Sequence, residues 1–371
     1  MNIDRLSYIL TKQCNLKCPF CFQFKTEWNN MQLKESDIIK FTDFVLENYT
    51  FDNLKISLIG GEPLLYKNFS IFEKVIDKFL NRNIQIKKII IFTNNTIYNE
   101  YFINLLKYIQ EKNIGIEYVL TPNLNDDFAR NRLFSDNIIN IYNKNKEHII
   151  KHFPKIIVRE YPVFDKTCLK YYYRIIRENN VMLRYCEYLS EELNFTKNDI
   201  RYMTNIVLDY IKELKLNIFI SPKAKEIISN SGLKYLKYLL YQDKLIKSCS
   251  DNCYPFITEI GIDPDGDIIP CSRVLGIKQH FKYPNINDNI EYIKNIISKL
   301  KQNNNNDITE DNFECKTCPL VIPCQTCKIL SNKVVMNGFN YVNPKEKCKY
   351  ELDQFYGVYE VLQERISEFI D

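Results

Sequence analysis

The chain has 371 residues, of which 45% are hydrophobic; this proportion is typical of a globular protein and excludes a disordered chain. Lysine and arginine number 50 and aspartate and glutamate 46, so the formal net charge of +4 does not indicate a nucleic-acid partner or an acidic membrane surface. No apolar run approaches the length of a transmembrane helix, and the N-terminus lacks the apolar core of a signal peptide. We therefore expect a cytoplasmic protein.

Strand-like apolar runs alternate with segments of helical spacing in the first half of the chain. Because this alternation is typical of a parallel sheet with helical crossovers, we expect an α/β fold. Residues 170–245 are predicted to be mostly helical, and Ser36 is the predicted N-cap of the first helix. The predicted strands cover residues 54–59, 88–92, 116–120 and 155–158, and the predicted helices cover residues 36–45, 71–80 and 99–110.

The C-terminal part contains a predicted hairpin and a predicted amphipathic helix. Residues 257–262 and 267–269 flank the turn sequence Asp-Pro-Asp-Gly at 263–266, which indicates a β-hairpin. The aspartates of this turn have a spacing that resembles a calcium loop, but the glycine is misplaced and the twelfth position lacks glutamate, so we predict a plain turn. Residues 352–370 place apolar side chains on one helical face.

Thirteen cysteines are unevenly distributed along the chain. In a reducing cytoplasm they do not form disulfides, and metal binding is the usual explanation for so many thiols. Three open the chain and eight lie near its C-terminal end. We therefore expect a catalytic domain over residues 1–245, a metal-rich domain over 246–350 and a terminal helix over 351–371.

The first cysteine group reads CNLKCPFC, and it can direct Cys14, Cys18 and Cys21 toward one point. Three buried cysteines of a helix are the alternative, which Pro19 disfavours because proline fits poorly inside a helix. A zinc site needs a fourth ligand, and none lies nearby. A [4Fe–4S] cluster held by three cysteines keeps one iron open, as a catalytic metal site requires.

This CxxxCxxC motif resembles the signature of the radical S-adenosylmethionine (radical SAM) enzymes. The resemblance implies that Cys14, Cys18 and Cys21 hold a [4Fe–4S] cluster whose open iron binds S-adenosylmethionine (SAM). Cleavage of SAM then gives a 5′-deoxyadenosyl radical that abstracts hydrogen, while the protein positions the cofactor. Phe20 matches the family position that packs near adenine.

The tetrapeptide Gly60-Gly61-Glu62-Pro63 ends a predicted strand. Glycine allows close approach to the backbone, and the Glu62 carboxylate can accept hydrogen bonds from a cationic amine. Alone this motif also fits an ordinary turn, but after CxxxCxxC it resembles the radical SAM element that holds the methionine amino group. Thr93 and Asn94 follow the next strand and resemble a TNG-type turn with Asn95 in place of glycine, which makes Thr93 and Asn94 candidate cofactor contacts.

Two CxxC pairs near the C-terminus can form a zinc ribbon on spacing alone. Behind a radical SAM signature, the pattern resembles the SPASM domain, which holds two auxiliary [4Fe–4S] clusters. The interval between the last two cysteines before Cys348 is two residues where the family usually has three. The family order implies one cluster on Cys249, Cys253, Cys271 and Cys327 and another on Cys315, Cys318, Cys324 and Cys348.

Cys168 and Cys186 remain outside these sets. We interpret them as buried small hydrophobic residues. The alternative is a thiol that donates a hydrogen atom or a proton in the active site.

The resemblance implies a partial, TIM-like (β/α)6 radical SAM barrel followed by a small SPASM domain. The SAM site is then expected at the carboxyl ends of the parallel strands. Because SPASM enzymes mostly modify peptides or proteins, the leading prediction is a maturase of a ribosomally made peptide that forms a crosslink, an epimer or an oxidised residue. Its electron donor is expected to be a flavodoxin or a ferredoxin.

Three alternatives stay open at this point. An anaerobic sulfatase-type maturase shares the length and the cysteine pattern, but Ser272 and Arg273 stand where that family carries an aspartate base. A radical dehydrogenase of a sugar or alcohol is the second alternative. The third is a non-enzymatic iron–sulfur electron carrier or zinc scaffold.

Overall fold

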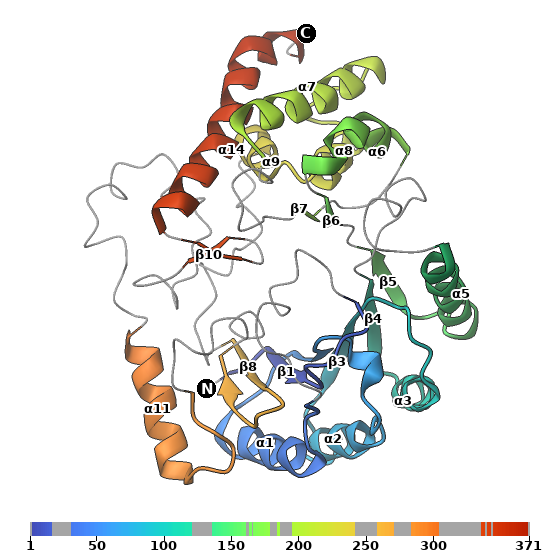
Figure 1. Ribbon diagram of the computed structural model, residues 1–371, viewed down its shortest axis with the longest axis vertical. Coiled ribbons are helices and arrows are strands. Elements are labelled where there is room, and N and C mark those ends of the chain that lie inside the picture. Colours follow the sequence, from blue (N-terminus) through green and yellow to red (C-terminus); the bar gives the residue numbers. More distant parts are fainter. Residues whose placement is uncertain are drawn as a thin grey trace. The chain divides into compact units, whose positions relative to one another are not determined.

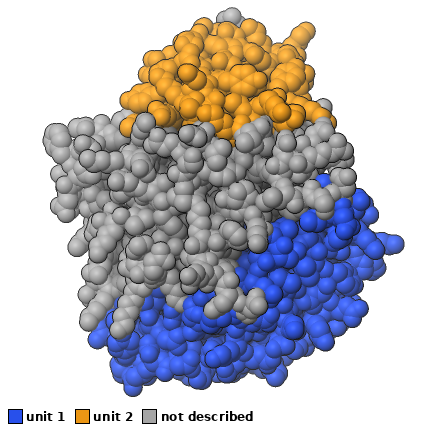
Figure 2. All heavy atoms as spheres, in the orientation of Figure 1, with its two compact units in different colours: residues 1–160, 253–306 blue, residues 161–252, 307–371 orange. Residues whose placement is uncertain are grey.

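The computed structural model divides into two compact units, Met1–Glu160 with Cys253–Asn306 and Tyr161–Asn252 with Asp307–Asp371 (Figure 2). The two compact units change at residues 160, 252 and 306. The domain boundaries near residues 245 and 350 remain predictions. The structure describes residues 2–16, 31–120, 136–160, 163–164, 166–178, 184–185, 195–241, 258–270, 283–303, 335–337, 340–342 and 344–369.

The first unit contains a seven-stranded sheet in the order β5-β4-β3-β2-β1-β8-β9 (Figure 1). Neighbouring strands from β5 to β8 pair in parallel, and β9 is antiparallel to β8. The α/β class and the parallel sheet are thereby confirmed. The strands are β1 Arg5–Ile9, β2 Leu54–Ile59, β3 Ile86–Thr93, β4 Gly115–Leu120, β5 Ile157–Glu160, β8 Glu259–Ile262 and β9 Ile268–Ile269.

Helices α1, α2 and α3 cover one face of this sheet (Figure 1). The ring of Tyr8 on β1 packs edge-on against Phe41 of α1 and Phe72 of α2, at centroid distances of 5.5 and 5.3 Å. Tyr118 of β4 stacks on Phe102 of α3 at 6.0 Å. The helices of this unit are α1 Glu35–Asn48, α2 Ile71–Leu80, α3 Glu100–Glu111, α5 Asp136–His152 and α11 Ile290–Asn303, with a 3-10 turn at Pro63–Leu65.

The predicted N-cap of the first helix, Ser36, is wrong and lies two residues after the observed N-cap. Helix α1 begins at Glu35, and its N-cap is Lys34, which makes no side-chain cap hydrogen bond. Ser36 lies inside the first turn, where its hydroxyl donates to Asp37. Glu35 and Asp37 instead place negative charge near the positive end of the helix dipole.

The predicted hairpin at 257–262 and 267–269 is confirmed as β8 and β9. Oδ1 of Asp263 accepts hydrogen bonds from the backbone N–H groups of Asp265 and Asp267, at 2.9 and 3.0 Å. Gly266 has a φ of +83°, which glycine adopts without steric cost. These bonds close a turn, as predicted. Because β8 pairs with β1, the hairpin is part of the seven-stranded sheet of the first unit.

The described residues of the second unit are mostly helical, as predicted for residues 170–245. Helix α7 begins with a capping box, in which Thr196 and Asp199 each bond to the other's backbone N–H. The predicted amphipathic helix is present, with Phe355, Val358 and Leu362 buried. No helix in the described part of the chain is long and apolar enough to cross a membrane. The helices are α6 Tyr172–Glu178, α7 Lys197–Glu213, α8 Pro222–Asn230, α9 Lys234–Tyr241 and α14 Pro344–Arg365, and short strand pairs are β6 Val163–Phe164 with β7 Arg184–Tyr185 and β10 Val335–Asn337 with β11 Asn340–Val342.

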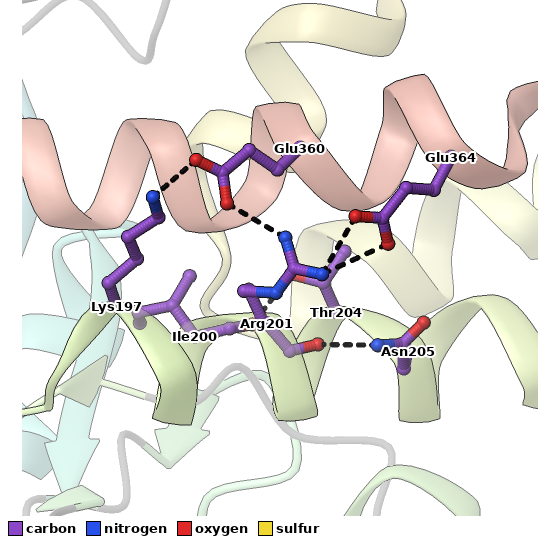
Figure 3. Close-up of polar contacts among 7 residues, drawn as sticks. All are labelled: Lys197, Ile200, Arg201, Thr204, Asn205, Glu360 and Glu364. Carbon is purple, nitrogen blue, oxygen red and sulfur yellow. Dashed lines mark hydrogen bonds and ion pairs between the residues drawn. The ribbon is translucent and has the colours of Figure 1, made fainter.

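Helices α7 and α14 pack side by side and are also joined by ion pairs (Figure 3). Arg201 bonds to Glu360 and Glu364, each at 2.8 Å, and Lys197 also pairs with Glu360. Gly357 lies against Ile200, where an added Cβ would be 2.9 Å from the Ile200 side chain. The glycine therefore allows the two helices to approach closely.

Candidate functional site

The backbone after β1 runs along the backbone after β2. The N–H of Gly61 donates to the carbonyl of Thr11, and the N–H of Glu62 donates to the carbonyl of Gln13, both at 2.8 Å. Cys14 is the next residue. The ladder between β1 and β2 therefore continues past the strand ends and places the first predicted cluster cysteine beside the Gly60–Pro63 motif.

The two glycines of the motif are required by this backbone contact. A Cβ on Gly61 would lie 2.3 Å from the Gln13 carbonyl oxygen, and a Cβ on Gly60 would lie 2.6 Å from that of Thr11. Gly60 also has a φ of +155°. The close approach that the sequence suggested for a ligand is made here by the chain itself.

Glu62 lies at the centre of the polar contacts between strand ends, and its side chain is fully buried. Its carboxylate accepts hydrogen bonds from the Thr93 hydroxyl at 2.6 Å, the Asn94 N–H at 2.7 Å and the Leu64 N–H at 3.0 Å. Burial raises the pKa of Glu62 to about 7, although hydrogen bonds from Thr93, Asn94 and Leu64 act in the opposite direction. No cation pairs with this carboxylate among the described residues, so an ammonium group bound beside it would favour the ionised form.

Asn94 connects the end of β3 to the cysteine loop. Its Nδ2 donates to Oδ1 of Asn15 at 3.0 Å and lies 4.0 Å from the Cys14 sulfur. Asn15 in turn donates to Thr96 at 2.8 Å, and the N–H of Leu16 donates to the Cys14 sulfur at 3.4 Å. Cys14 is exposed. N–H donors directed at sulfur stabilise a thiolate, the form that binds iron, so the donor set at this position fits a cluster ligand.

Asn95 is a buried residue whose positioning role the sequence did not reveal. It adopts a φ of +59°, a left-handed conformation that asparagine tolerates better than most residues. Its Nδ2 donates to the Tyr142 carbonyl at 2.9 Å, and its Oδ1 accepts from the Tyr118 hydroxyl at 2.7 Å. Asn145 donates to its carbonyl at 3.0 Å. Asparagine at the family's glycine position was the available signal, because both residues suit this backbone conformation.

The structure brings together Cys14, Gly60-Gly61-Glu62-Pro63, Thr93 and Asn94 at the carboxyl ends of β1, β2 and β3. Pro63 opens the 3-10 turn that follows Glu62. The remaining cluster assignments are predictions. Cys348 lies in α14 and Cys168 in the 3-10 helix Lys166–Tyr171, whereas Cys18, Phe20, Cys21, Cys186, Cys249, Cys253, Cys271, Cys315, Cys318, Cys324 and Cys327 lie outside the described residues.

Comparison with known proteins gives one family match and several similar folds. Residues 8–119 match the radical SAM superfamily. GTP 3′,8-cyclase of Desulforamulus reducens is 29% identical over 140 residues, which cover 36% of this chain and 40% of that protein. The chain therefore spans less than half the length of this curated relative.

Two solved structures illustrate the fold similarity. The structure of anSMEcpe with bound AdoMet and Cp18Cys peptide has a TM-score of 0.64 and 14% identity, covering 99% of this chain and 98% of that chain. Streptococcus suis SuiB bound to precursor peptide SuiA has a TM-score of 0.50 and 18% identity, and the match covers 87% of this chain and 71% of that chain. The first match extends the fold similarity beyond the barrel to the whole chain.

The family match includes the three strand ends that the structure brings together. The parallel order of β1 to β5 and the whole-chain similarity to anSMEcpe agree with a partial barrel. Residues 8–119 therefore match the radical SAM superfamily in sequence, and the chain as a whole has a fold similar to that of anSMEcpe.

Proposed function

We propose that the protein modifies a ribosomally made peptide by radical SAM chemistry. The observation that carries the proposal is the convergence of Cys14, Glu62 and Asn94 at the carboxyl ends of three parallel strands. When bound, a [4Fe–4S] cluster and SAM supply a 5′-deoxyadenosyl radical that abstracts a hydrogen atom. Cys14, Cys18 and Cys21 would hold the cluster, and Phe20 would contact the adenine.

Glu62 is the proposed acceptor for the SAM ammonium group. Its carboxylate is buried and has a raised pKa, so a cation beside it replaces solvation that burial removed. Thr93 and Asn94 fix the carboxylate in place, and Asn94 also holds the cysteine loop. The protein thus prepares the polar contacts before the cofactor arrives, which reduces the cost of ordering it.

The C-terminal cysteines are proposed to hold two auxiliary [4Fe–4S] clusters. One would use Cys249, Cys253, Cys271 and Cys327, and the other Cys315, Cys318, Cys324 and Cys348. Oxidation of a peptide radical releases one electron, and these clusters would accept it. A flavodoxin or ferredoxin is the proposed donor of the first electron, in the reducing cytoplasm that so many thiols require.

The fold similarities support a peptide substrate. Both anSMEcpe and SuiB were solved with peptides, Cp18Cys and SuiA. A sulfatase-type maturase is the second candidate, because the similarity to anSMEcpe covers 99% of the chain. Ser272 and Arg273 count against it, since that family carries an aspartate base there. A nucleotide cyclase is less well supported, because the GTP 3′,8-cyclase match covers only 40% of that protein.

Anaerobic reconstitution tests the proposal. We expect the iron-loaded protein, given SAM and a strong reductant, to form 5′-deoxyadenosine that mass spectrometry detects. The triple variant Cys14→Ala, Cys18→Ala, Cys21→Ala should form none, whereas Cys168→Ala, the matched single-thiol control, should retain the activity. Zinc in place of iron in the purified protein would contradict the cluster assignment.

Co-expression with candidate substrates then separates the two maturase functions. A mass change on a small ribosomal peptide supports the leading function. A formylglycine on a sulfatase-derived peptide, with no change on ribosomal peptides, would replace it with the second candidate.

A further inference from the structure

The face of the sheet turned away from α1, α2 and α3 carries a row of charged side chains near the start of the strands. Side chains of directly paired residues share a face, and alternate residues of a strand point to opposite faces. Tyr8 faces the helices, so Arg5 and Ser7 face away from them. In the register, Arg5 pairs with Lys55, and Lys55 pairs with Lys88. Three cations therefore occupy neighbouring cross-strand positions.

The two outer cations of this row have carboxylate partners. Arg5 lies 3.8 Å from Glu259, and Lys88 pairs with Glu117. The ammonium group of Lys55, between them, has no ion pair or hydrogen bond among the described residues, and the Lys55 backbone N–H donates to the Asp4 carbonyl at 2.9 Å. Burial and the charges of Arg5, Lys88 and Lys87 lower the pKa of Lys55, whereas the charge of Asp4 acts in the opposite direction. Like charges on directly opposed positions repel, and among the described residues no carboxylate forms an ion pair with Lys55 at the centre of this row.

A second polar group on the same face also lacks a partner. Ser57 is two residues after Lys55 on β2 and is 2% exposed, and its hydroxyl makes no hydrogen bond within the part of the chain that the structure describes. The cross-strand neighbour Ser7 has a partner, since its hydroxyl donates to Glu259 at 2.7 Å. A buried hydroxyl without a partner costs free energy that a bound acceptor recovers. Lys55 and Ser57 thus offer a cation and a hydroxyl donor from the same face of one strand.

We propose that Lys55 and Ser57, flanked by Arg5 and Lys88, bind one carboxylate of the substrate peptide. The choice of a peptide rests on the proposed function, whereas the anion site rests on the sheet alone. A single carboxylate matches the one lysine whose charge has no partner in the row. The flanking side chains are 40% exposed at Arg5 and 26% exposed at Lys88, so solvent reaches the row on both sides of Lys55.

The position of the site predicts where the carboxylate lies in the substrate. Lys55 lies on β2 and precedes Gly60, the residue just after that strand, by five positions, which corresponds to about 17 Å at the usual rise of a strand. An extended peptide covers this length with about five residues. We therefore expect an acidic residue, or the C-terminal carboxylate, about five residues from the residue that is modified.

Peptide binding to the reconstituted full-length protein without SAM tests the site. The probes are a nine-residue blocked peptide with one central glutamate, its glutamine analogue, and the glutamine analogue with a free C-terminal carboxylate. We expect the wild-type protein to prefer the glutamate or the free-acid peptide over the blocked glutamine peptide. The stronger of these two identifies the source of the carboxylate. Lys55→Gln should weaken binding of that peptide roughly tenfold and abolish the preference.

Thermal unfolding at low salt provides a readout that a structural role would not give. Removing one of three repelling cations should leave the melting temperature of Lys55→Gln equal to or above that of the wild type. Lys74→Gln is the matched control, because Lys74 is exposed on α2, which covers the opposite face of the sheet, and it should leave peptide binding unchanged.

Two results would overturn the proposal. The first is a Lys55→Gln variant that melts at a lower temperature and binds the glutamate and glutamine peptides as the wild type does. The second is competition by inorganic triphosphate with no preference for any carboxylate peptide, which would make the ligand a phosphate. Because SAM is absent, failure to form 5′-deoxyadenosine would reject the proposed function without affecting this result.

Discussion

The strand ends around Glu62 and the contact between α7 and α14 both contain many polar groups, but they use them differently. Around Glu62 the carboxylate is buried and accepts three hydrogen bonds. Between α7 and α14 the ionic side chains are partly exposed, with Arg201 at 28% and Glu364 at 56%. Losing a buried bond leaves a group that water cannot reach, whereas an exposed ion pair exchanges its partner for water. The first arrangement therefore fixes geometry, and the second contributes little to stability.

Apolar packing, rather than charge, carries the contact in the helical unit. Phe355, Val358 and Val361 of α14 are buried, and Gly357 lies against Ile200 of α7. The comparison implies that substitutions at close backbone or packing contacts have larger effects than substitutions of surface charges, in both units.

Gly61→Ala should produce the largest effect. The new Cβ would lie 2.3 Å from the Gln13 carbonyl oxygen, and both groups belong to paired backbones that cannot move apart alone. We expect a loss of about 3 kcal/mol in the free energy of unfolding and no 5′-deoxyadenosine. Urea denaturation measures the loss of unfolding free energy. Ser70→Ala, at an exposed residue with no cap bond, is the control, and equal stability of the two variants would contradict the tight contact.

Gly357→Ala should have the next largest effect. Its Cβ would meet the Ile200 side chain and the Lys197 carbonyl at 2.9 Å, so α14 must shift away from α7. We expect a loss of about 2 kcal/mol, measured by thermal unfolding, because overpacking outweighs the higher helix propensity of alanine. In a double-mutant cycle, Ile200→Ala should reduce the loss caused by Gly357→Ala, because it removes the Cγ2 atom that the new Cβ would meet. If Gly357→Ala alone stabilises the protein, the contact between α7 and α14 has space for a Cβ atom at position 357, which would contradict the prediction.

Glu62 should give the wild type a characteristic pH dependence. Its pKa is about 7 in the folded chain, against 4.5 for an ordinary glutamate side chain. A raised carboxyl pKa stabilises the fold at low pH, and this contribution is lost as the pH rises through about 7. Relative to Glu62→Gln, the wild type should therefore lose about 1.4 kcal/mol of stability between pH 6 and pH 8.5.

Parallel urea titrations of the two proteins across that pH range measure this difference. If the SAM ammonium group binds beside Glu62, SAM should diminish the change of unfolding free energy with pH, because a neighbouring cation lowers the pKa of Glu62. A stability difference that stays constant with pH would show that Glu62 is ionised throughout the range.

Arg201→Gln should have the smallest effect. The side chain loses its bonds to Glu360 and Glu364, but these groups are partly exposed and regain water. We expect a change of about 0.5 kcal/mol or less, which high salt diminishes further. A double-mutant cycle with Glu364→Gln isolates the pair. A coupling as large as the loss in Gly357→Ala would remove the distinction between the two regions.

Local sequence patterns were sufficient for most elements of the barrel. The run 54–59 and the helical spacing of 71–80 coincide with β2 and α2, because periodicity reports which side chains face a core. The cysteine spacing and the Gly60–Pro63 motif likewise indicated a radical SAM domain before any tertiary information. Lys34 as N-cap of α1 was missed because Ser36 has the stronger local capping preference.

Only the tertiary structure decided which distant residues meet. The sequence did not indicate that β8 pairs with β1, that the two glycines receive the backbone of Thr11 and Gln13, or that Asn95 bonds to Tyr118. Nor did it indicate that Lys55 lies between Arg5 and Lys88. Spacing along the chain encodes local conformation and short motifs, whereas hydrogen-bond partners and cross-strand charges depend on register, which the packing of the whole sheet sets.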